Sequence, residues 1–218
     1  MKKTLSTLAW LVYVLLLGAA LWRLHVNGMA SLGWLATSAI IMIIRAPYAK
    51  QVKGNAIDEK RAVARERGLL ALVAIGGNAL PLIHLATGAL KPFNYALPGW
   101  AAIVGAVLLV PGAWLFWRSH ADLGRNWSPT TELREDHSLT TTGVYAKIRH
   151  PMYTAIFILL GIQPLFVQNW IAGFAGVVTF GVLYVVRVGY EERMMLDRFG
   201  AAYEAYCQRA GRLIPTLG

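Results

Sequence analysis

The chain has 218 residues, of which 56% are hydrophobic and 15% are charged, and its mean hydropathy is +0.48. Soluble domains carry about 25% charged residues, so this composition excludes an ordinary soluble protein and indicates several membrane spans. The formal net charge of +10 would suit a nucleic-acid ligand. However, the basic residues follow the ends of apolar segments and form no separate basic domain, so we expect contacts with membrane lipids and not with nucleic acid.

Neither a disulfide nor a metal site is predicted. Cys207 is the single cysteine, which excludes an internal disulfide and a CxxC motif. His25, His84, His120 and His137 are scattered along the chain without the spacing of metal ligands. We therefore assign no metal.

Four apolar segments in the N-terminal half each come near the ~20 residues that cross a bilayer. They run from Leu5 to Leu24, from Met29 to Ile44, from Gly68 to Leu90 and from Leu97 to Trp117. The first follows Lys2 and Lys3, and we interpret it as an uncleaved span in preference to a signal peptide. In the third, Asn78 and His84 are expected first as interhelical contacts, and second as the lining of a tunnel for a lipid substrate.

A fifth apolar stretch, from Pro151 to Val188, is too long for one crossing and is interrupted at Gln168-Asn169. This pattern predicts a tight hairpin of two helices. Gly161 and Pro164 are expected to kink the first arm. Small residues let helices approach closely in membranes, and the second arm carries three of them, Gly173, Gly176 and Gly181.

The last segment, from Glu191 to Arg212, mixes charges with apolar side chains at three- and four-residue steps, which predicts an amphipathic helix on the cytoplasmic membrane surface. The expected fold is therefore all-α, a polytopic transmembrane bundle of about six spans that includes the C-terminal hairpin, plus this helix. We divide the chain into an N-terminal four-helix membrane region, residues 1–117, and a catalytic core, residues 118–218.

Basic residues concentrate in cytoplasmic loops. With six spans, 19 of the 21 Lys and Arg residues and all eleven acidic residues fall on one face, while Arg23 and Lys91 fall on the other. Both termini and the polar loops are therefore expected in the cytoplasm, which would make a bacterial protein one of the inner membrane. The charged loop from Tyr48 to Arg67 is interpreted as a solvated loop that sets this orientation.

The stretch from Thr142 to Thr154 is the candidate site. Gly143 permits a turn, and Pro151 suits the first turn of a helix. Arg149 and His150 would then lie beside the helix N-terminus, which attracts anions such as a carboxylate. Alternatively, Arg149 is a snorkelling residue at the membrane boundary and His150 a polar residue at the helix entrance.

Three sequence blocks between Leu123 and Pro215 resemble the isoprenylcysteine carboxyl methyltransferase family of integral membrane enzymes. They are Leu123-Gly-Arg-Asn-Trp-Ser128; Gly143-Val-Tyr145 leading into Arg149-His-Pro-Met-Tyr153; and Arg187-Val-Gly-Tyr-Glu-Glu192 with Phe199-Gly200, Tyr203, Tyr206 and Arg212-Leu-Ile-Pro215. The resemblance covers roughly the C-terminal 40% of the chain.

This resemblance implies a methyltransferase that uses S-adenosyl-L-methionine. The residues that fall on the family's cofactor-binding block are Gly143, Tyr145, Arg149, His150, Pro151 and Tyr153, and Glu191 is a further candidate for the cofactor. Arg187 and Glu192 match the family's catalytic Arg and Glu pair. Arg187 would hold the acceptor carboxylate, and Glu192 would orient Arg187 or the cofactor. Without the resemblance, the two would be an ion pair at the membrane boundary.

The acceptor is expected to be lipophilic, a small molecule or a prenylated substrate, with the carboxylate of an isoprenyl-cysteine-like compound preferred. A thiol or a phospholipid amine remains open, because Met152 and Thr154-Ala155 depart from the family pattern. Sterol-type reductases that use NADPH share an Arg-His-Pro block, but the Asn and the Gly-acid pair that usually follow it are absent here. A lipid-binding or assembly protein without turnover is the non-catalytic alternative. Asp136, His137 and Thr140 to Thr142 are left out of the site, since turn formation explains them equally well.

Overall fold

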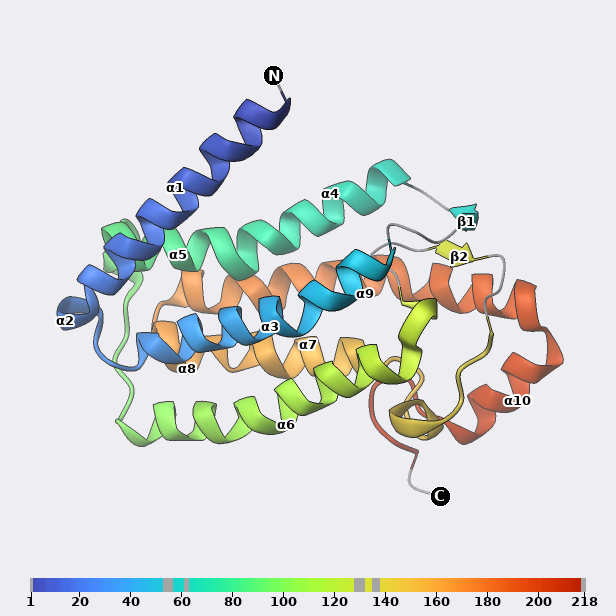
Figure 1. Ribbon diagram of the computed structural model, residues 1–218. Coiled ribbons are helices and arrows are strands. Elements are labelled where there is room, and N and C mark those ends of the chain that lie inside the picture. The colour runs from blue at the N-terminus through green and yellow to red at the C-terminus, as the bar shows by residue number, and fades with distance from the viewer. Residues whose placement is uncertain (1, 53–56, 61–62, 128–131, 135–137, 217–218) are drawn as a thin grey trace.

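Long helices lie side by side in a computed structural model that describes residues 2–52, 57–60, 63–127, 132–134 and 138–216 (Figure 1). The helices are α1 (Lys2–Trp22), α2 (Leu24–Asn27), α3 (Ser31–Val52), α4 (Val63–Ala74), the π-helix η1 (Ile75–Ala79), α5 (Leu80–Thr87), α6 (Trp100–Leu123), α7 (Pro151–Gly161), α8 (Gln163–Val167), α9 (Trp170–Phe199) and α10 (Ala201–Arg209). Short 3-10 helices are η2 (Lys91–Phe93), η3 (Gly124–Asn126) and η4 (Gly143–Ala146).

The expected all-α membrane bundle is confirmed. Within the described ranges, four helices are long and apolar enough to cross a membrane, namely Ser31–Ala49, Arg65–Thr87, Trp100–Leu123 and Trp170–Phe199. Two shorter apolar helices, Thr7–Trp22 and Pro151–Val167, complete the six expected segments. Two short antiparallel strands, β1 (Ile57–Lys60) and β2 (Glu132–Arg134), were not expected and join the loops at one end of the bundle (Figure 1).

The C-terminal hairpin turns where the sequence predicts. The first arm breaks between α7 and α8, at the expected position beside Gly161 and Pro164. Gln168 then takes a left-handed conformation with φ +49°, and Asn169 caps α9. The Asn169 side chain accepts from the amides of Ile171 and Ala172 at 3.0 and 2.9 Å, so it satisfies two amides that the helix itself leaves unpaired.

Two of the three glycines expected at helix contacts do lie at them. A Cβ on Gly176 would come within 2.6 Å of Gln163 Oε1 and 3.1 Å of the Gly77 Cα, so α9 touches η1 backbone to backbone. Gly173 has similar backbone neighbours. The expectation is wrong for Gly181, whose Cβ would meet nothing within 4 Å, because this part of α9 faces away from its neighbours.

The predicted start of the amphipathic helix, at Glu191, is wrong. The last span does not end before Glu191, since α9 continues without a breaker to Phe199. The chain reverses at Gly200, where φ is +49°, and α10 packs back through the buried Tyr203 and Tyr206. Glu191 therefore belongs to the same continuous helix as the last apolar segment.

The C-terminal segment fixes the start of α7. The amides of Arg149 and His150 donate to the carbonyls of Gly211 and Arg212 at 2.7 and 3.0 Å, and Gly211 donates back to Lys147 at 3.0 Å. These bonds place α10, the C-terminus and the loop before α7 at the same end of the bundle as β1 and β2 (Figure 1). The turn between α8 and α9 lies at the other end.

Candidate active site

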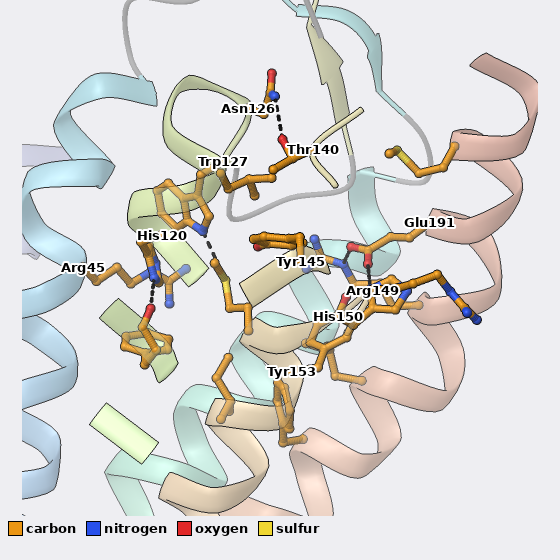
Figure 2. A pocket seen from close by; sticks show the side chains of 18 of the residues that line it. Arg45, His120, Asn126, Trp127, Thr140, Tyr145, Arg149, His150, Tyr153 and Glu191 are labelled. Carbon is orange, nitrogen blue, oxygen red and sulfur yellow. Dashed lines mark hydrogen bonds and ion pairs between the residues drawn. The ribbon is translucent and has the colours of Figure 1, made fainter. Parts of the chain in front are cut away.

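A cavity of about 310 Å³ opens at this end of the bundle and continues between the apolar helices (Figure 2). Ligand pockets for small molecules measure roughly 300–1,000 Å³. Its polar end is lined by Tyr145, Arg149, His150, Glu191, Tyr203 and Tyr206. Its apolar end is lined by Leu70, Val73, Gly77, Leu160, Phe180 and Leu183. One continuous space thus connects charged side chains to apolar side chains between the helices.

Glu192 joins three basic side chains just outside this cavity. Its Oε1 accepts from Arg149 at 3.1 and 3.2 Å, and from Nε2 of His150 at 3.3 Å. Arg212 donates to both carboxylate oxygens, at 3.0 and 2.5 Å. Bonding to Glu192 raises the pKa of Arg212. The cluster holds α9, the start of α7 and the C-terminal segment together.

Arg149 uses its remaining donors on the backbone of the C-terminal region. One terminal nitrogen donates to the carbonyls of Cys207, at 3.1 Å, and of Ala210. The side chain also lines the cavity. Arg149 is therefore neither a snorkelling residue nor a residue that faces only a ligand, because its guanidinium forms hydrogen bonds inside the protein.

Arg187 pairs with Glu191, which lies one helical turn further along α9. Its Nε donates to Glu191 Oε1 at 2.6 Å, and one terminal nitrogen lies 3.6 Å from Oε2 of the buried Glu66 on α4. The reason is helical geometry, since residues four apart share a face whereas residues five apart do not. The expectation that Glu192 orients Arg187 is therefore corrected to Glu191.

His150 lies between the two acidic residues. Its Nε2 bonds Glu192, while Nδ1 is 3.7 Å from Glu191 Oε2, which is too long for a hydrogen bond. Oε2 of Glu191 therefore keeps acceptor capacity toward the cavity. The His150 ring stacks on Tyr153 with centroids 5.4 Å apart, and the buried Tyr153 hydroxyl makes no hydrogen bond of normal geometry within the described chain.

Gly143 and Tyr145 shape the floor of the polar end. Gly143 has φ +60°, and a Cβ there would overlap the Asp122 carboxylate, which accepts from the Val144 amide at 2.9 Å. Tyr145 donates to the Ser119 carbonyl at 3.1 Å and its own carbonyl accepts from Tyr206 at 2.5 Å. Burial raises the pKa of Tyr145 and raises the pKa of Tyr206 to about 12, so both phenols are neutral donors near pH 7.

The predicted site residues divide into two groups. Those that line the cavity are Tyr145, Arg149, His150, Tyr153, Arg187 and Glu191. Gly143, Pro151 and Glu192 lie behind it, where they set the turn, the helix start and the ion cluster. Asn78 lines the cavity and His84 does not, which fits the tunnel interpretation for Asn78 alone. Asp136 and His137 fall outside the described residues.

Sequence reasoning missed four groups in or beside the cavity. Arg45, His120 and Trp127 line it, and Glu66 contacts Arg187. Trp127 belongs to a block that carries the family resemblance, and this was a usable signal. Arg45 and Glu66 gave no local signal, because both stand in a charged stretch that suits a solvated loop.

No group of three or more His, Cys, Asp or Glu suited to a metal occurs among the residues that the structure describes. The residues that line the cavity include the Glu191 carboxylate and the buried Tyr153 phenol, and α7 begins beside them at Pro151. Fold and site together define a multi-pass helical membrane protein with one pocket that has a polar end and an apolar end.

Residues 103–197 match the model of the isoprenylcysteine carboxyl methyltransferase family, which is the family that the three sequence blocks resemble. The chain is 29% identical to protein-S-isoprenylcysteine O-methyltransferase B of Arabidopsis thaliana over 54% of this chain and 61% of the relative. It is also 29% identical to the Homo sapiens protein-S-isoprenylcysteine O-methyltransferase, over 54% and 42% of the two chains. The chain thus spans less than two thirds of these relatives.

One solved structure shares the fold. It is described as the eukaryotic intramembrane Ras methyltransferase, an isoprenylcysteine carboxyl methyltransferase. The TM-score is 0.54 and the sequence identity 20%, over 92% of this chain and 74% of that one. The resemblance inferred from the three sequence blocks is confirmed.

Proposed function

We propose that this protein is a methyltransferase that transfers a methyl group from S-adenosyl-L-methionine to a lipophilic acceptor, with a carboxylate of an isoprenyl-cysteine-like compound as the preferred acceptor. The observation that carries the proposal is the single cavity, which joins the charged end to the space between apolar helices. A water-soluble donor and a membrane-dissolved acceptor can meet only where two such compartments are continuous. The match of residues 103–197 to the family model supports this assignment.

The polar end fits the donor group by group. The open Oε2 of Glu191 suits its ammonium, and the first-turn amides of α7, with His150, suit its carboxylate. The Tyr153 hydroxyl at the cavity wall can bond a further polar atom of the donor. Tyr203 and Tyr206 provide aromatic walls. When bound, the donor supplies an electrophilic sulfonium methyl.

The protein's contribution is alignment. A carboxylate acceptor is already a nucleophile, so the in-line displacement needs orientation more than it needs a general base. Arg187 lines the cavity between the two ends and is our candidate for contact with the acceptor, and Glu191 fixes the direction of its guanidinium. Glu192 acts from behind the wall by holding Arg149 and His150 in place.

We further propose that the polar end of the cavity faces the cytoplasm. Of the charged residues, 19 of 21 basic ones belong to segments expected on that face. The described loops of this group, with β1, β2 and α10, gather at the polar end (Figure 1). This orientation would allow the soluble donor to enter from the cytoplasm.

Calorimetry on detergent-purified protein tests the cofactor assignment. S-adenosylhomocysteine should bind the wild type, and Glu191→Gln should weaken it about tenfold or more, because a hydrogen bond to a charged group is lost. Tyr153→Phe should weaken binding about fivefold, because a polar contact from the cavity wall to the donor is lost.

Two matched variants serve as controls. Glu204→Gln removes an exposed carboxylate from α10, and Tyr95→Phe removes a hydroxyl that donates to the Pro164 carbonyl at the opposite end. Both should bind S-adenosylhomocysteine like the wild type. Binding of NADPH in place of S-adenosylhomocysteine would contradict the proposal and favour a reductase, and binding of neither would favour a lipid-binding protein.

A further inference from the structure

Arg45 carries a positive charge without a counterion at the cavity wall. It stands on α3 and is half-buried, and among the described residues it forms no hydrogen bond or ion pair. Its guanidinium lies 5.5 Å from the centroid of the Trp127 ring. The charged side chain that acts on it electrostatically is Arg187, which has the same sign. A half-buried charge without a partner is costly, so a ligand that supplies the missing negative charge would be stabilising.

His120 places an unused acceptor beside this cation. The residue is fully buried on α6, and its Nδ1 donates to the Phe116 carbonyl at 2.8 Å. Because a carbonyl can only accept, Nδ1 carries the proton and Nε2 holds a lone pair. Nε2 is buried and has no hydrogen-bond partner among the residues that the structure describes. Native structures rarely leave such an atom unpaired, which points to a donor on a ligand.

The two groups share one wall of the cavity. The Trp127 ring packs against the His120 ring at 4.9 Å and also lies under Arg45. Figure 2 shows Arg45 and His120 on one side of the cavity, with Arg149, His150 and Glu191 on the other. The donor's groups are already matched by the second side, so the first side is left for the acceptor.

Arg187 alone does not provide the positive charge that an anionic group of the acceptor needs. Its guanidinium is 2.6 Å from Glu191 and 3.6 Å from Glu66, so two carboxylates already balance it. A third carboxylate approaching Arg187 would meet their repulsion. Arg45 has no such neighbours and restores a net attraction for an anion.

We propose that Arg45 and His120 form the acceptor-binding site, in which Arg45 binds the anionic group of the methyl acceptor and Nε2 of His120 accepts a hydrogen bond from a neighbouring N–H of the same molecule. These two groups would then recognise the carboxylate and a neighbouring N–H of the acceptor proposed above. The aromatic wall of Trp127 and Phe116 covers the contact, and the apolar chain of the acceptor extends toward Phe180 and Leu183. The inference rests on the proposed methyl transfer and assigns residues to its second substrate.

Steady-state kinetics with two acceptors test both contacts. One acceptor is N-acetyl-S-prenylcysteine, and the other is the S-prenyl thiopropionic acid that lacks the N–H. Arg45→Gln should raise KM for both acceptors at least tenfold, and Arg45→Lys should recover part of the loss. For the wild type, KM should be about fivefold lower with the N–H present, and His120→Phe should abolish that difference.

Cofactor affinity and melting temperature separate this role from structural ones. Arg45→Gln and His120→Phe should bind S-adenosylhomocysteine with affinities within twofold of the wild type. Arg45→Gln should also melt no lower than the wild type, since it breaks no ion pair among the described residues. Arg67→Gln, on an exposed part of α4, is the charge-matched control and should leave KM unchanged.

An unchanged KM in Arg45→Gln would overturn the proposal. So would a tenfold loss of cofactor affinity, because Arg45 would then belong to the donor's end. A wild type that binds no S-adenosylhomocysteine would instead refute the proposed function, which keeps the two failures distinct.

Discussion

Glu192 is the side chain on which the C-terminal part of the site depends. It accepts hydrogen bonds from Arg149, His150 and Arg212, and its side chain is only 16% exposed. Breaking a buried ion pair costs about 3–5 kcal/mol, and an exposed pair is worth less than ~1 kcal/mol. For this intermediate exposure we expect Glu192→Gln to destabilise the protein by about 2 kcal/mol.

In a chain of this size, a loss of about 2 kcal/mol lowers the melting temperature by roughly 4–8 °C. Differential scanning fluorimetry in detergent measures the shift. Glu204→Gln, the charge-matched change on the exposed face of α10, should leave the melting temperature within about 1 °C. Equal melting temperatures for Glu192→Gln and the wild type would show that the Glu192 cluster does not stabilise the protein.

Several residues at the polar end of the cavity could be predicted because they lie in one short stretch of sequence. Arg149, His150 and Tyr153 are neighbours in sequence, and the helix that Pro151 starts presents them together. The partner of Arg187 could also have been found, since Glu191 is one helical turn away and Glu192 is not. Glu66 and Arg45 could not, because nothing local distinguishes an inward-facing charge from a solvated one.

At the scale of elements, the sequence predicts the hairpin well and the end of α9 poorly. Gln168-Asn169 interrupts an apolar run, and Asn is a strong helix cap, so the turn has a local cause. The continuation of α9 into a charged segment has none, since charged helix formers suit a solvated helix and a cytoplasmic extension of a span equally. The break at Gly200 is visible in sequence only as one glycine among 21.

The π-helix η1 lay beyond sequence reasoning for a different reason. An Ile-Gly-Gly-Asn-Ala segment in an apolar helix predicts close packing, and not a specific widening of the turn. In the structure, Gln163 donates to the Gly77 carbonyl at 3.1 Å, and Gly77 and Asn78 line the cavity. Such bulges are frequent at functional sites. Tertiary contacts from α8 and α9 select it.

At the scale of the whole molecule, the cavity draws on both regions into which we divided the sequence. α3, η1 and α6 form one part of the wall, and α7, α9 and the loops before α7 form the other. Hydrophobic periodicity locates spans along the chain, but it does not say which spans are neighbours in the bundle. The sequence therefore did not predict that α3 and α6 contribute Arg45 and His120 to the cavity wall. The division of the chain at residue 117 into a membrane region and a catalytic core stays a prediction.

Reporter fusions test the orientation of the whole bundle. A reporter placed after Lys91 and one placed at the C-terminus should lie on opposite sides of the membrane, with the C-terminal one in the cytoplasm. The reason is the 19-to-2 distribution of basic residues. Two reporters on the same side would refute six spans and leave the four long helices as the better count.

Methyl transfer itself tests the central claim most directly, namely that the cavity joins a polar donor to a lipophilic carboxylate. Purified protein in lipid vesicles is incubated with methyl-labelled S-adenosyl-L-methionine and N-acetyl-S-prenylcysteine, and label is counted in the organic extract before and after treatment with base. We predict that the wild type transfers label and that base releases it as methanol, because a carboxyl methyl ester is base-labile and a methyl thioether or methylamine is not. Base-stable label would contradict the carboxylate acceptor, and the absence of label in any lipophilic acceptor would contradict the methyltransferase itself.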